Sequence, residues 1–156
     1  MLNETQEEKD VRFMQAAFEE ALLAAEEDEV PIGAVVVSNG RIIGRGHNLT
    51  ERLCDVTAHA EMQALTAASE YLGGKYLPKC TIYVTVEPCM MCAGALGWSQ
   101  IGRIVYGASD PRRGYSALIA PESGVTPLHP KTLVTPGVME KECAALMKDF
   151  FSRKRR

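Results

Sequence analysis

Apolar residues follow two patterns along the chain, and each pattern predicts a different element of secondary structure. Over residues ~8–28 the apolar side chains stand three or four positions apart, which predicts an amphipathic helix. Short runs rich in β-branched residues at 32–37, 81–86 and 103–107 instead predict strands. The first third of the chain therefore opens with a helix and continues into strands.

Turn and capping residues indicate how these runs are joined. Asn39-Gly40 is a strong hairpin signal and connects the first strand to a return strand at 41–45. We expect Thr57 to cap a helix that runs to Leu72, where Gly73-Gly74 ends it. Pro88 should open a further helix over about residues 89–99.

The last third of the chain contains a long aperiodic segment. Residues 109–131 hold Gly, Pro and Ser without a period and predict a loop, followed by a short strand at 131–135 and a helix over 139–153. A loop of that length in a compact domain is usually functional or disordered. The alternation predicts an α/β fold, a three-layer αβα sandwich on a mixed sheet of about five strands, in one domain over 1–156.

Composition narrows the class of protein. The 156 residues are 46% hydrophobic and 24% charged, which excludes collagen-like, disordered and disulfide-scaffold compositions. No run of 18 apolar residues predicts a membrane span, and the acidic N-terminus does not resemble a signal peptide. Five cysteines, an odd number, argue against a disulfide framework. We therefore expect a cytoplasmic protein.

Charge is distributed unevenly around a net value of −3. The first 29 residues are strongly acidic, whereas the last six include four bases and no acid: Arg153, Lys154, Arg155 and Arg156. Two interpretations stay open. The acidic helix and basic tail are either solvated surfaces, or the tail, through residues such as Arg153 and Arg155, binds an anionic partner such as nucleic-acid phosphate.

Two short segments carry ligands that suit a metal. His59 lies in Thr-Ala-His-Ala-Glu, and Cys89 and Cys92 lie in Glu-Pro-Cys-Met-Met-Cys, each at the start of a predicted helix. One imidazole and two thiolates suit Zn²⁺, and three protein ligands leave the fourth tetrahedral position for water. Zinc lowers the pKa of that water to about 7, which makes hydroxide available at neutral pH. We predict one catalytic zinc ion per chain.

Two other interpretations of the same residues remain open. Cys54 is available as a fourth ligand, which would make the zinc site structural, and a lone Cys-x-x-Cys is also typical of a redox pair. Glu61 favours catalysis, because a structural site has no need of a carboxylate beside the metal. On an ideal helix Glu61 lies about 200° around the axis from His59, so we expect it to carry protons and not to bind the metal.

The chain resembles the zinc-dependent nucleoside and nucleobase deaminases, whose signature is His-x-Glu followed by Pro-Cys-x-x-Cys. The resemblance is greatest to members that convert adenosine 34 of a tRNA anticodon loop to inosine. It rests on four segments: Pro31–Val35, Asp55–Glu61, Tyr83–Ala95 and Glu142–Leu146. It implies a cytidine-deaminase-like fold, a homodimer and hydrolytic deamination of tRNA by zinc-activated hydroxide.

The resemblance also implies roles for individual residues. His59, Cys89 and Cys92 match the zinc ligands, and Glu61 matches the proton shuttle. Asn48 matches an asparagine that hydrogen-bonds the base, and Asp110 an aspartate near the sugar of the bound nucleotide.

Two features bear on the substrate and the assembly. Around residues 96–101, 111–115 and 131–132 the chain departs from the tRNA-acting members, so deamination of a free nucleobase or nucleoside, such as guanine or cytosine, stays as the alternative. Apolar Leu96, Trp98 and Ile101 follow the Cys-x-x-Cys helix and are candidates for a dimer interface.

Overall fold

A mixed five-stranded sheet in the order β2-β1-β3-β4-β5 is the centre of the computed structural model, which describes residues 3–154. The strands are β1 (Gly33–Ser38), β2 (Arg41–His47), β3 (Thr81–Val86), β4 (Arg103–Ala108) and β5 (Leu133–Thr135). The helices are α1 (Gln6–Glu26), α2 (Ala60–Leu72), α3 (Met90–Ser99) and α4 (Glu140–Lys154). The predicted αβα sandwich and its opening hairpin are confirmed.

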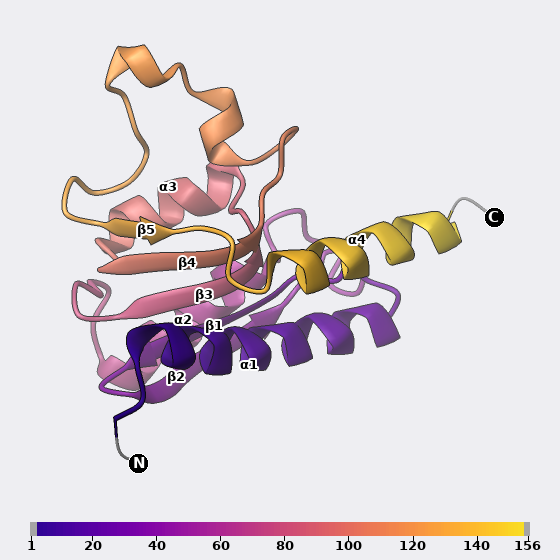
Figure 1. The fold of residues 1–156 in the computed structure, drawn as a ribbon, viewed down its shortest axis with the longest axis horizontal. Coiled ribbons are helices and arrows are strands. Elements are labelled where there is room, and N and C mark those ends of the chain that lie inside the picture. The colour runs from indigo at the N-terminus through magenta and orange to yellow at the C-terminus, as the bar shows by residue number, and fades with distance from the viewer. Residues whose placement is uncertain (1–2, 155–156) are drawn as a thin grey trace.

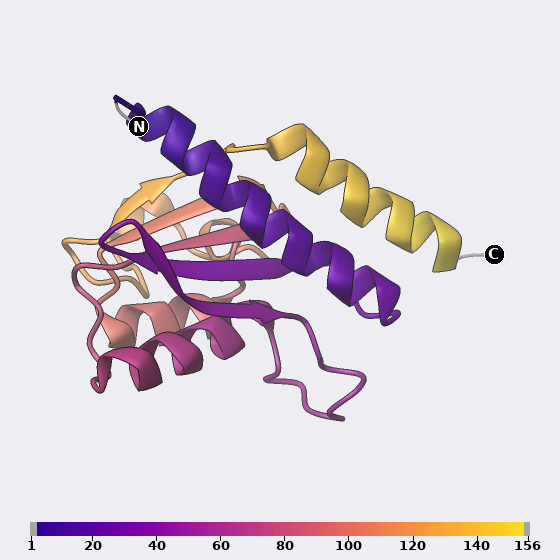
Figure 2. The same ribbon diagram turned by 90° about the horizontal axis from the view of Figure 1, so that it is seen from below.

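The two faces of the sheet are buried under different helices. Along β1, Ala34 and Val36 belong to the core beneath α2 and α3, whereas Val35 and Val37 pack against α1. This is the two-residue period of a strand buried on both faces. Seen from below, α1 and α4 lie on one side of the sheet and α2 and α3 on the other (Figure 2). Within residues 3–154, no helix is long and apolar enough to cross a membrane.

Capping chemistry places two helix starts differently from the sequence prediction. The helix α1 begins at Gln6, ahead of residue 8, because Thr5 and Glu8 form a capping box. The prediction that Thr57 caps α2 was wrong, because its hydroxyl and its N–H both donate to the Asp55 carboxylate. The N-cap of α2 is His59, two residues later.

The segment between β4 and β5 contains more structure than the predicted loop. Two short 3₁₀ helices, Tyr115–Leu118 and Pro121–Ser123, interrupt it. The segment, orange in Figure 1, extends away from the sheet past α3. Its first part, residues 109–116, stays beside the ends of β3 and β4, where Tyr115 N–H donates to the Pro88 carbonyl at 2.9 Å.

The direction of the strands gathers their ends at one edge of the sheet. Both β2 and β3 run antiparallel to β1, while β4 and β5 run parallel to β3, so four strands end at this edge. The residues that directly follow β2, β3 and β4 are Asn48, Glu87 and Ser109. In open α/β sheets, ligands bind outside the carboxyl ends of the strands.

Close packing of α2 on β2 brings the start of that helix to the same edge. A Cβ at Gly46 would lie 2.5 Å from the carbonyl oxygen of Ala60, and one at Gly44 would lie 2.4 Å from that of Ala64. Only glycine permits this approach. The first turn of α2 therefore lies directly against the strand that ends at His47.

An ion pair between Asp10 and Arg103 joins α1 to β4. The guanidinium donates to both carboxylate oxygens, at 2.8 and 2.6 Å, and Tyr83 donates its hydroxyl to the same carboxylate at 2.8 Å. Burial raises the pKa of Asp10, but the hydrogen bonds from Arg103, Tyr83 and Gln6 outweigh it and hold the pKa below its ordinary value. The charged carboxylate therefore contributes to the stability of the fold.

Replacing Asp10 by Asn should lower the free energy of unfolding by ~3 kcal/mol, the lower end for a broken buried pair, because Arg103 is left partly buried without its counterion. Urea denaturation measures this, with Asp149→Asn, in an exposed pair on α4, as the control that should change little. In the parent protein this contribution is present above the ordinary pKa of Asp and is lost as the pH falls through the lowered folded pKa. Equal stability of Asp10→Asn and the parent would contradict this account.

Candidate active site

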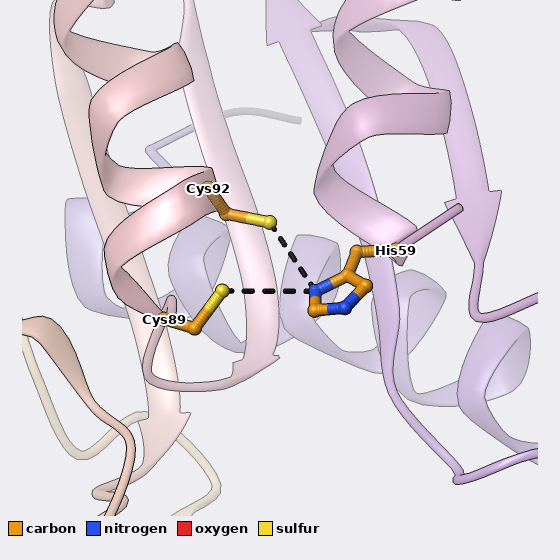
Figure 3. Close-up of side chains that lie close together, drawn as sticks. All are labelled: His59, Cys89 and Cys92. Atoms are coloured by element: carbon orange, nitrogen blue, oxygen red, sulfur yellow. Dashed lines mark hydrogen bonds between the residues drawn. The ribbon is translucent and has the colours of Figure 1, made fainter. Parts of the chain in front are cut away.

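Three side chains from two helix starts converge beyond the sheet edge. The Sγ atoms of Cys89 and Cys92 lie 3.7 and 3.5 Å from Nδ1 of His59, and Figure 3 shows all three side chains pointing toward one another. One ligand atom from each lies within 4.8 Å of the others. The sequence motifs that are 30 residues apart therefore form one cluster.

Capping geometry explains how these residues reach the same point. His59 and Cys89 are the N-caps of α2 and α3, each with an extended backbone, so their side chains project ahead of the helices. Cys92 lies in the first turn of α3, on the side of Cys89. Because His59 precedes α2, the helical angle expected between it and Glu61 does not apply, and both line the same cavity.

The charge state of the cluster favours a cation. Hydrogen bonds from Cys92 and His59, with the field of His59, lower the pKa of Cys89 to about 4 despite its partial burial. The Cys89 sulfur and burial raise the pKa of Cys92, because a second thiolate would be formed beside the first. A dication among the sulfurs would relieve this repulsion, and two thiolates with one imidazole match the ligand preference of Zn²⁺. The donor set therefore fits the metal expected from the sequence.

Cys54, the alternative fourth ligand, does not join the cluster. It is exposed, and its thiol lies 3.7 Å from the Glu51 carbonyl, to which it donates. The three clustered ligands thus leave one tetrahedral position without a protein ligand among the described residues, as in catalytic zinc sites.

Glu61 lies beside the cluster in a small cavity. It is 3% exposed, and burial raises the pKa of its carboxyl group to about 7. A group with that pKa can both accept and release a proton at neutral pH. The cavity has a volume of about 230 Å³ and is lined by Val30, Ile32, Asn48, Thr50, His59, Ala60 and Glu61. It is smaller than the ~300–1,000 Å³ of sites for drug-sized ligands, so it suits a group of about nucleobase size.

Asn48 is placed to meet a ligand in this cavity. It is 6% exposed, and its Oδ1 accepts a hydrogen bond from Thr50 N–H at 3.2 Å, which fixes the orientation of the amide. Its backbone N–H donates to the Ile32 carbonyl. The structure therefore brings Asn48 together with His59 and Glu61.

A second groove adjoins the cavity, and Asp110 lies in its wall. The groove has a volume of about 480 Å³ and shares Val30 and Ile32 with the cavity. Its other lining residues come from the ends of β3 and β4, the segment 109–113 and α4: Val86, Ala108, Ser109, Asp110, Pro111, Arg112, Arg113, Ala144, Met147 and Phe151. Two arginines thus stand at a groove that continues from the base-sized cavity.

The basic tail is only partly described. Arg153 is exposed and pairs with Asp149 on its own helix at 3.3 Å, and Lys154 pairs with Asp28 beyond the end of α1. Arg155 and Arg156 lie outside the described residues. A larger groove, of about 810 Å³, lies beside Lys154 between the ends of α1 and α4, and none of the clustered ligands lines it.

Two buried carboxylates were missed by sequence reasoning. Glu29 accepts hydrogen bonds from the backbone of Glu51 and Arg52, and Glu87 accepts them from the segment that follows β4. They are 1% and 5% exposed. Glu87 could have been noticed in the sequence, because an acidic residue there lies directly between a predicted strand and the Pro-Cys motif.

The apolar residues after the Cys-x-x-Cys motif divide into two groups. Leu96 and Ile101 are 0% and 1% exposed and belong to the core, so the prediction that they form an interface was wrong. Trp98 is 85% exposed. Helical spacing explains the difference, because Leu96 and Trp98 lie on opposite sides of α3.

Comparison with known proteins agrees with this geometry. The model of the MafB19-like deaminase family matches residues 8–155. The tRNA-specific adenosine deaminase of Agrobacterium fabrum is 47% identical over 148 residues, which cover 92% of this chain and 94% of that protein.

Solved structures of deaminases are also similar to this chain. One, from a study of A-to-I editing by tRNA:A34 deaminases, superposes with a TM-score of 0.79 and 45% identity, over 86% of this chain and 98% of that one. The guanine deaminase of Bacillus subtilis superposes with a TM-score of 0.60 and 33% identity, over 72% of this chain and 68% of that one. The chain therefore belongs to the MafB19-like deaminase family, in which its relatives include tRNA-specific adenosine deaminases.

Proposed function

We propose that this protein hydrolytically deaminates adenosine to inosine at wobble position 34 of tRNA. The observation that carries the proposal is the His59-Cys89-Cys92 cluster beside buried Glu61, in a base-sized cavity that continues into a groove bearing two arginines. Relatives named tRNA-specific adenosine deaminase support the substrate. The proposal places the enzyme in the cytoplasm, with its tRNA substrate.

The proposed ligands of one zinc ion per chain are His59, Cys89 and Cys92. Bound there, Zn²⁺ would supply a nucleophile from water at neutral pH. Both helix N-termini direct their positive dipole ends at the cluster, which favours the thiolate form of the two cysteines. The protein thus prepares a site for a dication before the ion is bound.

Glu61 is the proposed proton carrier. In the overall reaction, water adds to C6 of adenine and the exocyclic amino group leaves as ammonia, so protons must move from the water to the ring and then to the leaving nitrogen. The Glu61 carboxylate can take the first proton of the water and deliver it to N1, and then take the second proton, from the hydroxyl added at C6, and deliver it to the amino group, which leaves as ammonia. Burial suits it to both tasks, since its pKa lies at about 7.

Asn48 and the adjoining groove are proposed to bind the nucleotide. The Asn48 amide lines the cavity and can hydrogen-bond the base, while the groove accommodates the sugar and phosphates that the cavity is too small to hold. Asp110 lies in the wall of the groove, and Arg112 and Arg113 supply positive charge there. Arg153 and Arg155 extend the proposed RNA contact toward the C-terminus.

Deamination of a free base, such as guanine, is the second candidate. The similarity to a guanine deaminase favours it, and the small cavity would hold a free base. The groove and its arginines would then have no ligand, because a free base carries no phosphate. We therefore favour tRNA over a free base as the substrate.

A homodimer is also proposed. Met91 and Trp98 stand seven residues apart on one side of α3, with exposed fractions of 37% and 85%. Leu118, Val125 and Leu133 are exposed on the neighbouring segment and strand, at 55%, 68% and 66%. Large exposed apolar side chains are found at protein interfaces, and a second copy of the chain is the partner we propose.

Replacing Glu61 by Gln should abolish most deamination of an anticodon stem-loop bearing A34, with a loss of about 10²–10⁴-fold in kcat, as for general acid–base groups. Gln keeps the shape of the side chain but cannot carry the proton. Inosine formation measures the rate, and the zinc content should match that of the parent.

The same assay decides between the two substrates. The parent should convert the stem-loop and leave free adenosine, guanine and cytosine almost unchanged. Binding of the stem-loop should weaken as salt is added. The logarithm of its binding constant should fall with the logarithm of the salt concentration, with a slope of about −0.7 for each phosphate contact on a single strand. Turnover of a free base in preference to the stem-loop, or full activity of Glu61→Gln, would contradict the proposal.

Replacing Trp98 by Lys should weaken the proposed dimer, because a charge would be buried at its interface. Sedimentation at micromolar concentration should give a dimer for the parent and a monomer of 17.1 kDa for the variant. Tyr71→Lys is the control, since Tyr71 is 62% exposed but lies on α2. A monomeric parent chain would rule the dimer out.

A further inference from the structure

Glu87 is a buried carboxylate that is not one of the proposed catalytic groups. It follows β3 directly and is 5% exposed. Within residues 3–154, no lysine or arginine forms an ion pair with it. Burying a carboxylate without a cation is costly unless hydrogen bonds compensate for the lost water. The identity of its donors therefore indicates what the carboxylate holds in place.

Among the residues that the structure describes, the side-chain hydrogen bonds of Glu87 all reach one short segment. Oε1 accepts from the Asp110 N–H at 3.1 Å, while Oε2 accepts from both the N–H and the hydroxyl of Ser116, at 3.1 and 2.5 Å. The two oxygens thus hold the two ends of residues 110–116. Charge-assisted bonds of this kind are about twice as strong as neutral ones.

The backbone of this segment is also joined to the Pro-Cys motif. Tyr115 N–H donates to the Pro88 carbonyl at 2.9 Å, and Gly114 forms an isolated antiparallel bridge with Cys89. A Cβ at Gly114 would lie 2.4 Å from Oε1 of Glu87, so only glycine allows the segment to come this close. Glu87 therefore links the strand end that leads to Cys89 with the segment that follows β4.

The same segment forms the wall of the substrate groove. Asp110 has its own N–H held by Glu87, and its Oδ1 accepts hydrogen bonds from the backbone of Arg112 and Arg113, at 3.1 and 3.0 Å. The path of the chain through all three groove residues thus depends on the anchor at Glu87. Displacing it would move the groove relative to the base-sized cavity.

We propose that Glu87 is a positioning residue for RNA: its carboxylate, with Ser116, holds residues 110–116 so that the groove lies in register with the cavity. This assignment rests on the proposed function. Glu87 acts through the segment and touches neither the metal site nor the base. Its loss should affect binding of the RNA more than the chemical step.

Glu87→Gln tests the proposal with almost no change in shape. The amide replaces one accepting oxygen by an NH₂ group, which cannot accept from Asp110 or Ser116, so one end of the segment is released. Trypsin should then cut after Arg112 or Arg113 about tenfold faster than in the parent, as expected when one buried hydrogen-bonding anchor is lost. KM for the A34 stem-loop should also rise about tenfold while kcat stays within about threefold, the pattern for lost binding.

Two further variants make the test specific. Glu122→Gln changes an exposed acid in the same connecting segment and should alter neither trypsin cleavage nor KM. Ser116→Ala removes only the hydroxyl donor. It should raise both the rate of trypsin cleavage and KM, by less than Glu87→Gln does. It serves in place of Glu87→Gln if that variant does not fold or retain zinc.

Unchanged cleavage and an unchanged KM in Glu87→Gln and Ser116→Ala would overturn the proposal. A loss confined to kcat would overturn it as well, because Glu87 would then affect the chemical step and not the binding of the RNA. If the parent fails to deaminate the stem-loop, the proposed function fails. The trypsin comparison still decides in that case whether Glu87 anchors the segment.

Discussion

The N-termini of α2 and α3 meet beyond the carboxyl ends of the strands, and the rest of the site depends on this convergence. It places His59 and Cys89, both N-caps with extended backbones, ahead of their helices and within 3.7 Å of each other. Packing sets it up, because Gly44 and Gly46 allow α2 to lie on β2 at a distance that any larger residue would prevent. A similar approach at Gly114 brings the groove wall against Glu87.

Electrostatics and burial give the converging residues different tasks. The thiols face two helix N-termini and each other, so their environment favours one thiolate readily and a second only with a cation. Glu61, in the first turn of α2, is so deeply buried that burial outweighs its favourable contacts and raises its pKa to about 7. Glu87 is equally buried but has three hydrogen-bond donors, which suits it to hold a segment in place. The environment of each carboxylate thus separates proton transfer from positioning.

The αβα fold and the two metal-type motifs were predictable because they depend on local patterns. Short runs rich in β-branched residues marked β1 and β3, and Asn39-Gly40 marked the hairpin. The exact helix starts were not predictable, because Thr57 can cap a helix or bind Asp55, and only the folded loop decides. The role of Glu87 depends on residues more than twenty positions away, which no local pattern records. The exposure of Trp98 and burial of Leu96 likewise follow from how α3 sits on the sheet.

The zinc content of the purified 156-residue chain tests the central claim most directly. The account predicts one zinc ion per chain in the parent and in Cys54→Ala, since Cys54 lies outside the cluster. It predicts a loss of nearly all zinc in Cys89→Ala, which removes one of three protein ligands. Full zinc occupancy in Cys89→Ala, or loss of the metal in Cys54→Ala, would contradict the account.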